Sequence, residues 1–341
     1  NYAPFDTRPN FEATESDISV ALLTDHLNTT KSKLAKQIGK RGVMEVLGDM
    51  QLLVGPPEQL CISNAALMMF CEHLDKFFPY TQVEITKFPE GSIKNPNNFI
   101  EVPVIKGSVP TMIKRTMEKL QDMVIEEKVT KVDYQMEAIR RYSYPYQALE
   151  EAVVNAFYHR DYQSYQAIII EIEPDCVRII SYPGIDRSIS QKTIAEGERF
   201  KSRYYRNKRL GEFLKELDLT EGKSTGIPTI QEELRDNGSP KATFETDDER
   251  RAVTVEIPIH PDFLMEQGEP QNEPQNEPQN ATSVEDAILQ LIRMNKYVTR
   301  EEMASQIEVS LSTVKRSINK LKTSGIIEYE GPSKGGYWSI K

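Results

Sequence analysis

The chain alternates apolar and polar positions in a regular way as far as residue 265. Apolar side chains three and four positions apart predict helices, whereas strict alternation predicts strands. The mixture of both predicts an α/β or α+β fold, and Pro174-Asp175 between two strands indicates a hairpin. Helices are predicted at residues 16–28, 33–50, 109–127, 148–162, 210–217 and 227–237. Strands are predicted at residues 82–88, 99–106, 167–173, 176–182, 242–246 and 251–258, and a strand that runs into a helix at 59–70.

A low-complexity tract then interrupts the pattern. Three copies of Glu-Pro-Gln-Asn occupy residues 269–280, without any large apolar side chain. Such a tract cannot bury enough surface to offset the entropy lost on ordering, so we expect a mobile linker. The chain is predicted to divide into a mixed α/β region at residues 1–137, which continues into a second α/β part at 138–265, a linker at 266–282 and a C-terminal module at 283–341.

The C-terminal module resembles a winged helix-turn-helix. An amphipathic helix is predicted at 284–294, and Thr299 with Glu302 forms a capping box that starts a second helix. The remaining predicted elements are a turn at residues 309–312, a third helix at 312–322, and strands at 326–330 and 337–340 that flank a Gly-rich wing at 331–336.

The third helix carries four Lys/Arg side chains and no acidic one, within a module that has nine Lys/Arg and seven Asp/Glu. This charge suits insertion into the major groove of double-stranded DNA, and a two-fold operator would require a homodimer. Winged helices also bind proteins, so a protein interface is the alternative. The residues predicted to contact DNA are Ser312, Thr313, Lys315, Arg316, Asn319 and Lys320 on the helix, and Lys334 in the wing.

Net charge, cysteine content and the length of apolar runs exclude some classes of protein. The net charge of -10 argues against a protein that coats nucleic acid over its whole surface, but not against one basic module. Three scattered cysteines predict a reducing cytoplasm without disulfides, and no apolar run is long enough to cross a bilayer. No Cys/His spacing indicates zinc or haem. Residues 199–209 place six cations beside two tyrosines, which predicts anion capture, a DNA-backbone contact or a solvated loop.

The predicted helix at 148–162 carries more polar chemistry than packing requires. Glu151, Asn155 and His159 are four residues apart, so a helix would align them on one face. Apolar residues on the other side would bury the helix against the core. The polar face is either a ligand site or a polar network that holds the helix to a sheet.

Five motifs carry a family resemblance: Glu151-x-x-x-Asn155, Ala156-x-x-His159-Arg160-Asp161-Tyr162, Pro183-Gly184, Arg206-Asn207 and Ser224-Thr225-Gly226-Ile227-Pro228. The chain resembles the GHKL superfamily, the nucleotide-binding fold of gyrase, heat-shock chaperone, histidine kinase and mismatch-repair ATPases. It is more closely similar to bacterial Schlafen/AlbA-type transcriptional regulators, often labelled RecG-like helicases, over nearly all of residues 5–260. The AlbA-like domain of such proteins is then expected to precede residue 1.

The resemblance implies a site for ATP and Mg²⁺. In an active member, Asn155 would hold Mg²⁺ and Glu151 would orient or deprotonate the attacking water. Glycine-rich turns would bring backbone N–H groups to the phosphates. The other residues expected to bind nucleotide are His159, Arg160, Asp161, Gly184, Arg206, Asn207, Thr225 and Gly226.

The chain departs from the active family pattern at two loops. Active ATPases have Asp-x-Gly-x-Gly, whereas residues 181–186 read Ser-Tyr-Pro-Gly-Ile-Asp, without the adenine-reading acid and the second glycine. Residues 221–226 keep only two glycines. The sequence therefore predicts a DNA-binding transcriptional regulator with a degenerate, nucleotide-binding ATPase-like domain. The alternative is an enzyme that hydrolyses ATP, at most a weak Mg²⁺-dependent ATPase, acting on nucleic acid or partner proteins.

Overall fold

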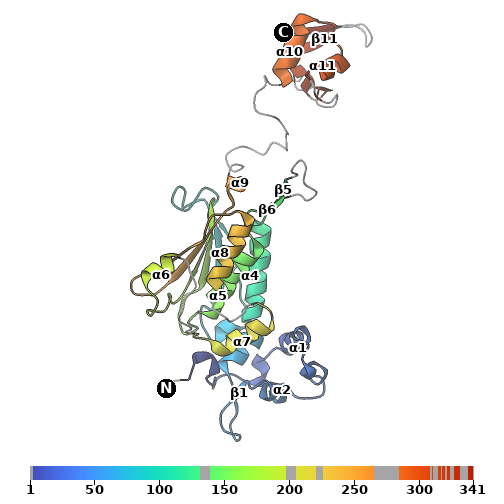
Figure 1. The fold of residues 1–341 in the computed structure, drawn as a ribbon. Coiled ribbons are helices and arrows are strands. Elements are labelled where there is room, and N and C mark those ends of the chain that lie inside the picture. The colour runs from blue at the N-terminus through green and yellow to red at the C-terminus, as the bar shows by residue number, and fades with distance from the viewer. Residues whose placement is uncertain are drawn as a thin grey trace. The chain divides into compact units, whose positions relative to one another are not determined.

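The computed structural model of the chain describes two compact units, residues 1–270 and 271–341 (Figure 1). The predicted linker at 266–282 lies outside the described residues. The structure describes residues 3–130, 139–196, 205–219, 226–264, 284–307, 309, 314–315, 317–318, 321–322, 326–330 and 337–340.

A six-stranded sheet forms the centre of the first unit. Its order is β4-β3-β7-β8-β10-β9, and neighbours are antiparallel except for the parallel pair β3 and β7. The hairpin predicted at Pro174-Asp175 joins β7 to β8, with Ile172 opposite Val177. The strands are β3 (Val83–Lys87), β4 (Ile100–Glu101), β7 (Ile168–Ile172), β8 (Cys176–Ser181), β9 (Thr243–Thr246) and β10 (Val253–Pro258).

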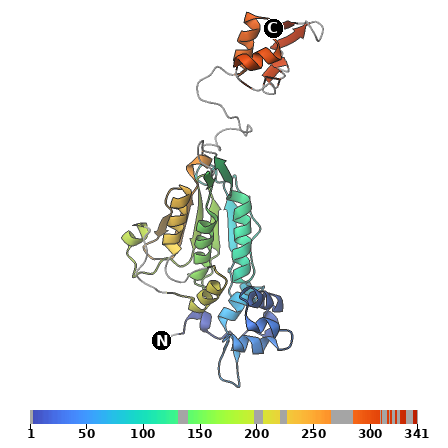
Figure 2. The same cartoon turned by 45° about the vertical axis from the view of Figure 1, so that its right-hand side comes forward.

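Three helices cover one face of this sheet, as Figures 1 and 2 show: α4 (Val109–Val124), α5 (Tyr146–Tyr158) and α8 (Gly226–Asn237). Period-two alternation explains the packing, because Ile168, Ile170 and Ile172 are buried while the side chains between them are only half-buried. The result is a two-layer α/β sandwich, which confirms the predicted fold class.

The region before α4 belongs to the same hydrophobic core. Helix α3 is buried at all seven residues, which explains the apolar run from Ala65 to Phe70. The strand-into-helix prediction for 59–70 corresponds to β2 followed by α3. The elements of this region are η1 (Phe5–Thr7), η2 (Glu15–Asp17), α1 (Val20–Thr29), η3 (Lys33–Lys36), α2 (Val43–Asp49), β1 (Leu53–Val54), β2 (Cys61–Ile62), α3 (Asn64–Phe70) and η4 (Leu74–Lys76).

Two predicted elements differ in the structure. The helix predicted at 33–50 is divided into η3 and α2, because Gly39 and Gly42 interrupt it and Gly42 takes the N-cap position of α2. The strand predicted at 99–106 is reduced to β4 and an isolated bridge at Ile105. Pro103 lies between them and has no N–H for a continuous ladder.

Smaller elements complete the first unit. They are a hairpin of β5 (Glu127–Thr130) and β6 (Ile139–Tyr142), and the helices α6 (Gln191–Glu196), α7 (Lys208–Glu216) and α9 (Pro261–Leu264). Among the described residues, no helix is long and apolar enough to span a membrane.

The second unit has its own small core. Helices α10 (Val284–Met294) and α11 (Arg300–Ile307) pack with the antiparallel strands β11 (Ile327–Glu330) and β12 (Tyr337–Ile340). The capping box at the start of α11 is confirmed. Glu302 accepts the N–H of Thr299 at 2.8 Å, and the Thr299 hydroxyl accepts that of Glu302 at 3.2 Å. The buried apolar residues are Ile288, Ile292, Val298, Met303, Val314, Ile318, Leu321, Ile327 and Trp338.

Candidate nucleotide site and nucleic-acid interface

Helix α5 brings Glu151 and Asn155 together. Asn155 Nδ2 donates a hydrogen bond to Glu151 Oε1 at 3.0 Å, across one turn of the helix, and both side chains are half-buried. This bond turns the nitrogen of the amide toward the carboxylate and leaves the amide oxygen on the other side. Burial of Ala152, Val153 and Ala156 fixes the helix rotation that presents this pair.

The first residue of α8 lies directly against this pair. A Cβ atom on Gly226 would come within 2.6 Å of Asn155 Nδ2 and 2.6 Å of Glu151 Oε1, so only glycine fits without displacement. The first turn of a helix presents unpaired N–H groups and a partial positive charge. The structure thus combines a carboxylate, an amide and a helix N-terminus at one place. Thr225 lies outside the described residues.

His159 lies just beyond the helix rather than on it. Helix α5 ends at Tyr158, and His159 is the C-cap residue, whose N–H donates to Asn155 O at 3.0 Å. The imidazole stacks on Tyr158 at 4.9 Å between ring centroids. Part of the His159 side chain is exposed, but the protein atoms packed around it lower the pKa of His159 by desolvation. The positive charge of the Arg206 guanidinium is the second, smaller cause. The imidazole is therefore neutral at pH 7.

Arg160 and Asn207 lie in the interior and bind backbone groups. Arg160 is 1% exposed and donates from Nη2 to Tyr80 O at 3.0 Å. Asn207 is fully buried, and its Nδ2 donates to Tyr158 O at 3.0 Å and to Arg160 O at 2.7 Å. These contacts hold the end of α5 against the segment that precedes α7. We therefore interpret both residues as positioning residues for the site.

Asp161 and Gly184 are also engaged within the protein. The N–H of Asp161 donates to Tyr182 O at 3.0 Å, and its Oδ1 accepts the N–H of Gln163 at 3.0 Å. The N–H of Gly184 donates to Arg250 O at 3.0 Å. A Cβ on Gly184 would meet Thr246 Oγ1 and lie 2.6 Å from Ala252 O. Glycine is thus required here for close packing against the β9–β10 turn.

Arg206 is a cation that acts electrostatically on His159, the residue that caps the C-terminal end of α5. Its side chain is half-buried, and its Nε has no hydrogen-bond partner among the described residues. Its charge contributes to the lowered pKa values of His159 and, more weakly, of Asp186, where hydrogen bonds from Ser188 are the main cause. A guanidinium with spare donors can bind the oxygens of a phosphate.

Sequence reasoning missed Asp6, which supports this region from the N-terminal end of the chain. The Asp6 carboxylate is fully buried, and Oδ2 accepts the N–H groups of Arg209 at 2.7 Å and Leu210 at 3.0 Å. It therefore caps α7 from a distant part of the sequence. No local sequence signal could have revealed this pairing.

The arrangement suits a divalent metal only if a ligand brings further oxygens. Within the described parts of the chain, no three His, Cys, Asp or Glu side chains form a group that could hold a metal ion. The Asn155 amide and the Glu151 carboxylate are hard oxygen donors, which Mg²⁺ prefers together with phosphate and water. The donor set thus fits a magnesium ion shared with a nucleotide.

In the C-terminal unit, Val314, Ile318 and Leu321 face the core, as predicted. Lys315 and Lys322 are exposed. This places cationic side chains of the third helix away from the core. The other predicted DNA-contacting residues lie outside the described residues: Ser312, Thr313, Arg316, Asn319, Lys320 and Lys334.

Comparisons with known proteins match two parts of the chain. The family model described as "Putative ATP-dependent DNA helicase recG C-terminal" matches residues 166–256, and a model described as "HTH domain" matches residues 284–337. The chain thus combines an ATPase-like domain with a helix-turn-helix domain of the DNA-binding type. The first match includes Gly184, Arg206 and Gly226, but begins after Glu151 and Asn155.

A solved structure has a similar fold. The DIP2311 protein from Corynebacterium diphtheriae matches with a TM-score of 0.57 and 16% identity, and the match covers 100% of this chain. The chain spans 64% of the length of that protein. At this identity the likeness concerns the fold alone. A search of curated proteins finds no match.

Proposed function

We propose that the protein is a cytoplasmic DNA-binding transcriptional regulator of the Schlafen/AlbA type, whose ATPase-like domain binds a magnesium nucleotide, ATP. The observation that carries the nucleotide proposal is the contact of Gly226 with Glu151 and Asn155. It joins two segments 71 or more residues apart at the N-terminus of a twelve-residue helix, where anions bind well.

The side chains have distinct roles in this proposal. The Asn155 amide oxygen faces away from Glu151 and would hold Mg²⁺, while the N–H groups of α8 and the Arg206 guanidinium would bind phosphate oxygens. Bound Mg²⁺ would neutralise phosphate charge. Arg160 and Asn207 hold the surrounding backbone.

Binding without efficient hydrolysis is the form that we favour. Glu151 already accepts a hydrogen bond from Asn155, and the loop at Gly184 is packed against Arg250 and Ala252. That loop also lacks the acid and the second glycine of active ATPases. The domain would then act as a nucleotide sensor rather than as a motor.

Calorimetric titration of ATP into the full chain, with and without Mg²⁺, tests the nucleotide site. We expect saturable binding that requires Mg²⁺ and that Asn155→Ala and Glu151→Gln abolish. Glu245→Gln changes an exposed carboxylate on β9 in the same way and should bind normally. Absence of binding would overturn the proposal, and multiple turnovers that require Glu151 would favour the ATPase alternative.

The winged helix would bind double-stranded DNA, as a homodimer on a two-fold operator. Lys315→Ala together with Arg316→Ala should weaken binding and reduce the dependence of log K on log salt concentration by about one per lost phosphate contact. Lys241→Ala removes an exposed cation of the first unit and is the matched control. An unchanged salt slope in the double variant would favour a protein interface instead.

A further inference from the structure

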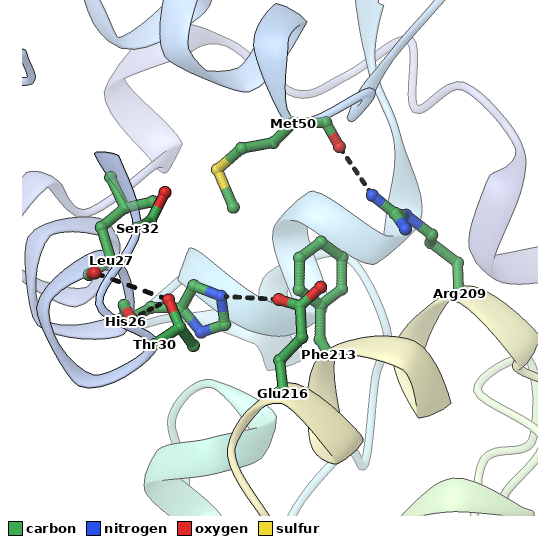
Figure 3. Close-up of a pocket in the computed structure, with 8 residues that line it drawn as sticks. All are labelled: His26, Leu27, Thr30, Ser32, Met50, Arg209, Phe213 and Glu216. Carbon is green, nitrogen blue, oxygen red and sulfur yellow. Dashed lines mark hydrogen bonds and ion pairs between the residues drawn. The ribbon is translucent and has the colours of Figure 1, made fainter. Parts of the chain in front are cut away.

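The outer side of α7 borders a cavity of ≈ 370 Å³, which is within the range of small-ligand sites. Figure 3 shows that side chains from three parts of the chain surround it. They are His26, Leu27, Thr30 and Ser32 from α1 and the turn after it, Met50 from the end of α2, and Arg209, Phe213 and Glu216 from α7.

One wall of the cavity is apolar. Leu27 and Phe213 are almost completely buried, and Met50, which is half-buried, adds a further apolar side chain to the lining (Figure 3). The His26 ring contacts Phe213 edge to face, with 5.5 Å between the ring centroids. Met50 therefore offers contact to a small ring or a short alkyl chain, whereas Leu27 and Phe213 have almost no exposed surface, and none of the three carries a charge to orient a ligand.

Glu216 supplies a charge at the same cavity. His26 Nε2 lies 3.4 Å from Glu216 Oε2, and the Glu216 side chain is 50% exposed. Burial lowers the pKa of His26, against the opposite effect of the nearby carboxylates of Glu216 and Asp25. The imidazole is therefore neutral at pH 7, so its contact with Glu216 does not cancel the charge of that carboxylate.

Arg209, the cation in the lining, is held by other partners. Its Nη1 pairs with Glu212 Oε2 at 2.6 Å, and its Nη2 donates to Met50 O at 2.6 Å. Its guanidinium lies 4.6 Å from the centroid of the Phe213 ring. Arg209 thus builds the wall, and Glu216 has no cationic partner among the described residues.

We propose that this cavity binds a small organic cation, an ammonium or amidinium group on a compact apolar body. The cationic group pairs with Glu216, and the apolar body lies against Met50. A charge-assisted hydrogen bond to a half-exposed carboxylate supplies selectivity, and the half-buried Met50 side chain supplies apolar contact.

Occupation of the cavity would restrain α7. The opposite side of this helix packs so closely on α5 that a Cβ on Gly211 would collide with the Tyr158 ring. A ligand between α1 and α7 would therefore clamp α7 from both sides. We expect slower hydrogen exchange of backbone amides in residues 20–32 and 208–216.

Three probes of similar size and different charge test whether binding to the full chain requires a cationic group. Phenethylamine should bind saturably in calorimetric or ligand-observed NMR titrations and should slow exchange in α7. The neutral 2-phenylethanol and the anionic 3-phenylpropionate should bind at least about tenfold more weakly, as expected for one charge-assisted hydrogen bond. Equal affinity for amine and alcohol, or no saturable amine binding, would overturn the proposal.

Two substitutions at the exposed Glu216 locate the effect. Glu216→Gln should reduce amine affinity by about tenfold or more, and Glu216→Lys should reverse the preference toward 3-phenylpropionate. Glu118→Gln changes an exposed carboxylate on α4 and should bind the amine as the unmodified chain does. Amine affinity unchanged by both Glu216 substitutions would also overturn it. ATP binding is a separate measurement, so either proposal can fail without the other.

Discussion

The Asp6 carboxylate caps helix α7 by accepting the backbone N–H of Arg209 at 2.7 Å, across 203 positions of the chain. It also accepts the N–H of Leu210 at 3.0 Å. Because α7 follows Asn207 and packs on Tyr158, this cap connects the first residues of the chain to the candidate nucleotide site.

Removal of this cap should destabilise the first unit. We expect Asp6→Ala to lower the free energy of unfolding by about 1–3 kcal/mol, because two N–H groups of α7 lose their acceptor in the interior. Urea unfolding followed by circular dichroism measures the difference. Asp248→Ala, which changes an exposed aspartate after β9, is the control and should change stability little. Equal stability of both variants would show that the cap contributes nothing.

The pH dependence of the Asp6 effect has a defined sign. Burial raises the pKa of Asp6 above 3.8, although the N–H groups of Leu210 and Arg209 act in the opposite direction. The native state therefore holds this proton to a higher pH than the unfolded state. Compared with Asp6→Asn, the unmodified chain should lose stability as pH rises from 3.8 through the raised pKa. A constant difference would contradict a raised pKa.

Gly226→Ala should disturb the candidate site specifically. The new Cβ would lie 2.6 Å from side-chain atoms of both Glu151 and Asn155, so either these side chains or the start of α8 must shift. We expect a loss of about 1–3 kcal/mol in stability and loss of ATP binding in calorimetry. Gly39→Ala is the matched control, because no atom lies within 4 Å of its Cβ position. Normal ATP binding by Gly226→Ala would argue against a ligand at this contact.

Asn207→Ala should loosen the end of α5. The substitution leaves the carbonyls of Tyr158 and Arg160 without their buried donor, at an expected cost of about 1–3 kcal/mol. Hydrogen exchange should become faster in α7 and at the end of α5. Asn98→Ala removes only an exposed bond to Glu90 and should stay within about 0.5 kcal/mol of the unmodified chain.

His159 should make stability fall in mildly acidic solution. Its surroundings and Arg206 lower the pKa of His159 below 6.5, so the native state resists a proton that the unfolded state accepts. This contribution is fully present above pH 6.5 and is lost as pH falls toward the lowered pKa. Between pH 7 and pH 5, the unmodified chain should therefore lose more stability than His159→Gln in urea titrations. Equal losses of stability in the two proteins would show that the native state does not lower the pKa of His159.

Local patterns predicted the parts of the site that lie within one element. Glu151 and Asn155 are one helical turn apart, so the sequence spacing alone places them together on α5. The hairpin at Pro174-Asp175 and the capping box of α11 are also local, because each depends on neighbouring residues. The spacing of apolar positions likewise predicted a mixture of helices and strands, while the two-layer sandwich was expected from the family resemblance.

The rest of the site depends on contacts between distant segments. Spacing extended the α5 helix to residue 162, but the backbone turns after Tyr158, and the N–H of Asp161 then bonds to Tyr182. Arg160 and Asn207 were predicted from their motifs as nucleotide contacts. In the structure both side chains are buried and donate hydrogen bonds to backbone carbonyl groups of other segments.

The sequence by itself determined the α/β class, the position of the Glu151 and Asn155 pair on one helix face, and the separate winged-helix module, because these follow from spacing along the chain. Tertiary structure alone decided that Gly226 closes on that pair, that Asp6 caps α7 and that Glu216 meets His26 in a cavity. Those contacts arise when separate elements bury their apolar faces together, and the positions that then meet leave no periodic signal in the sequence.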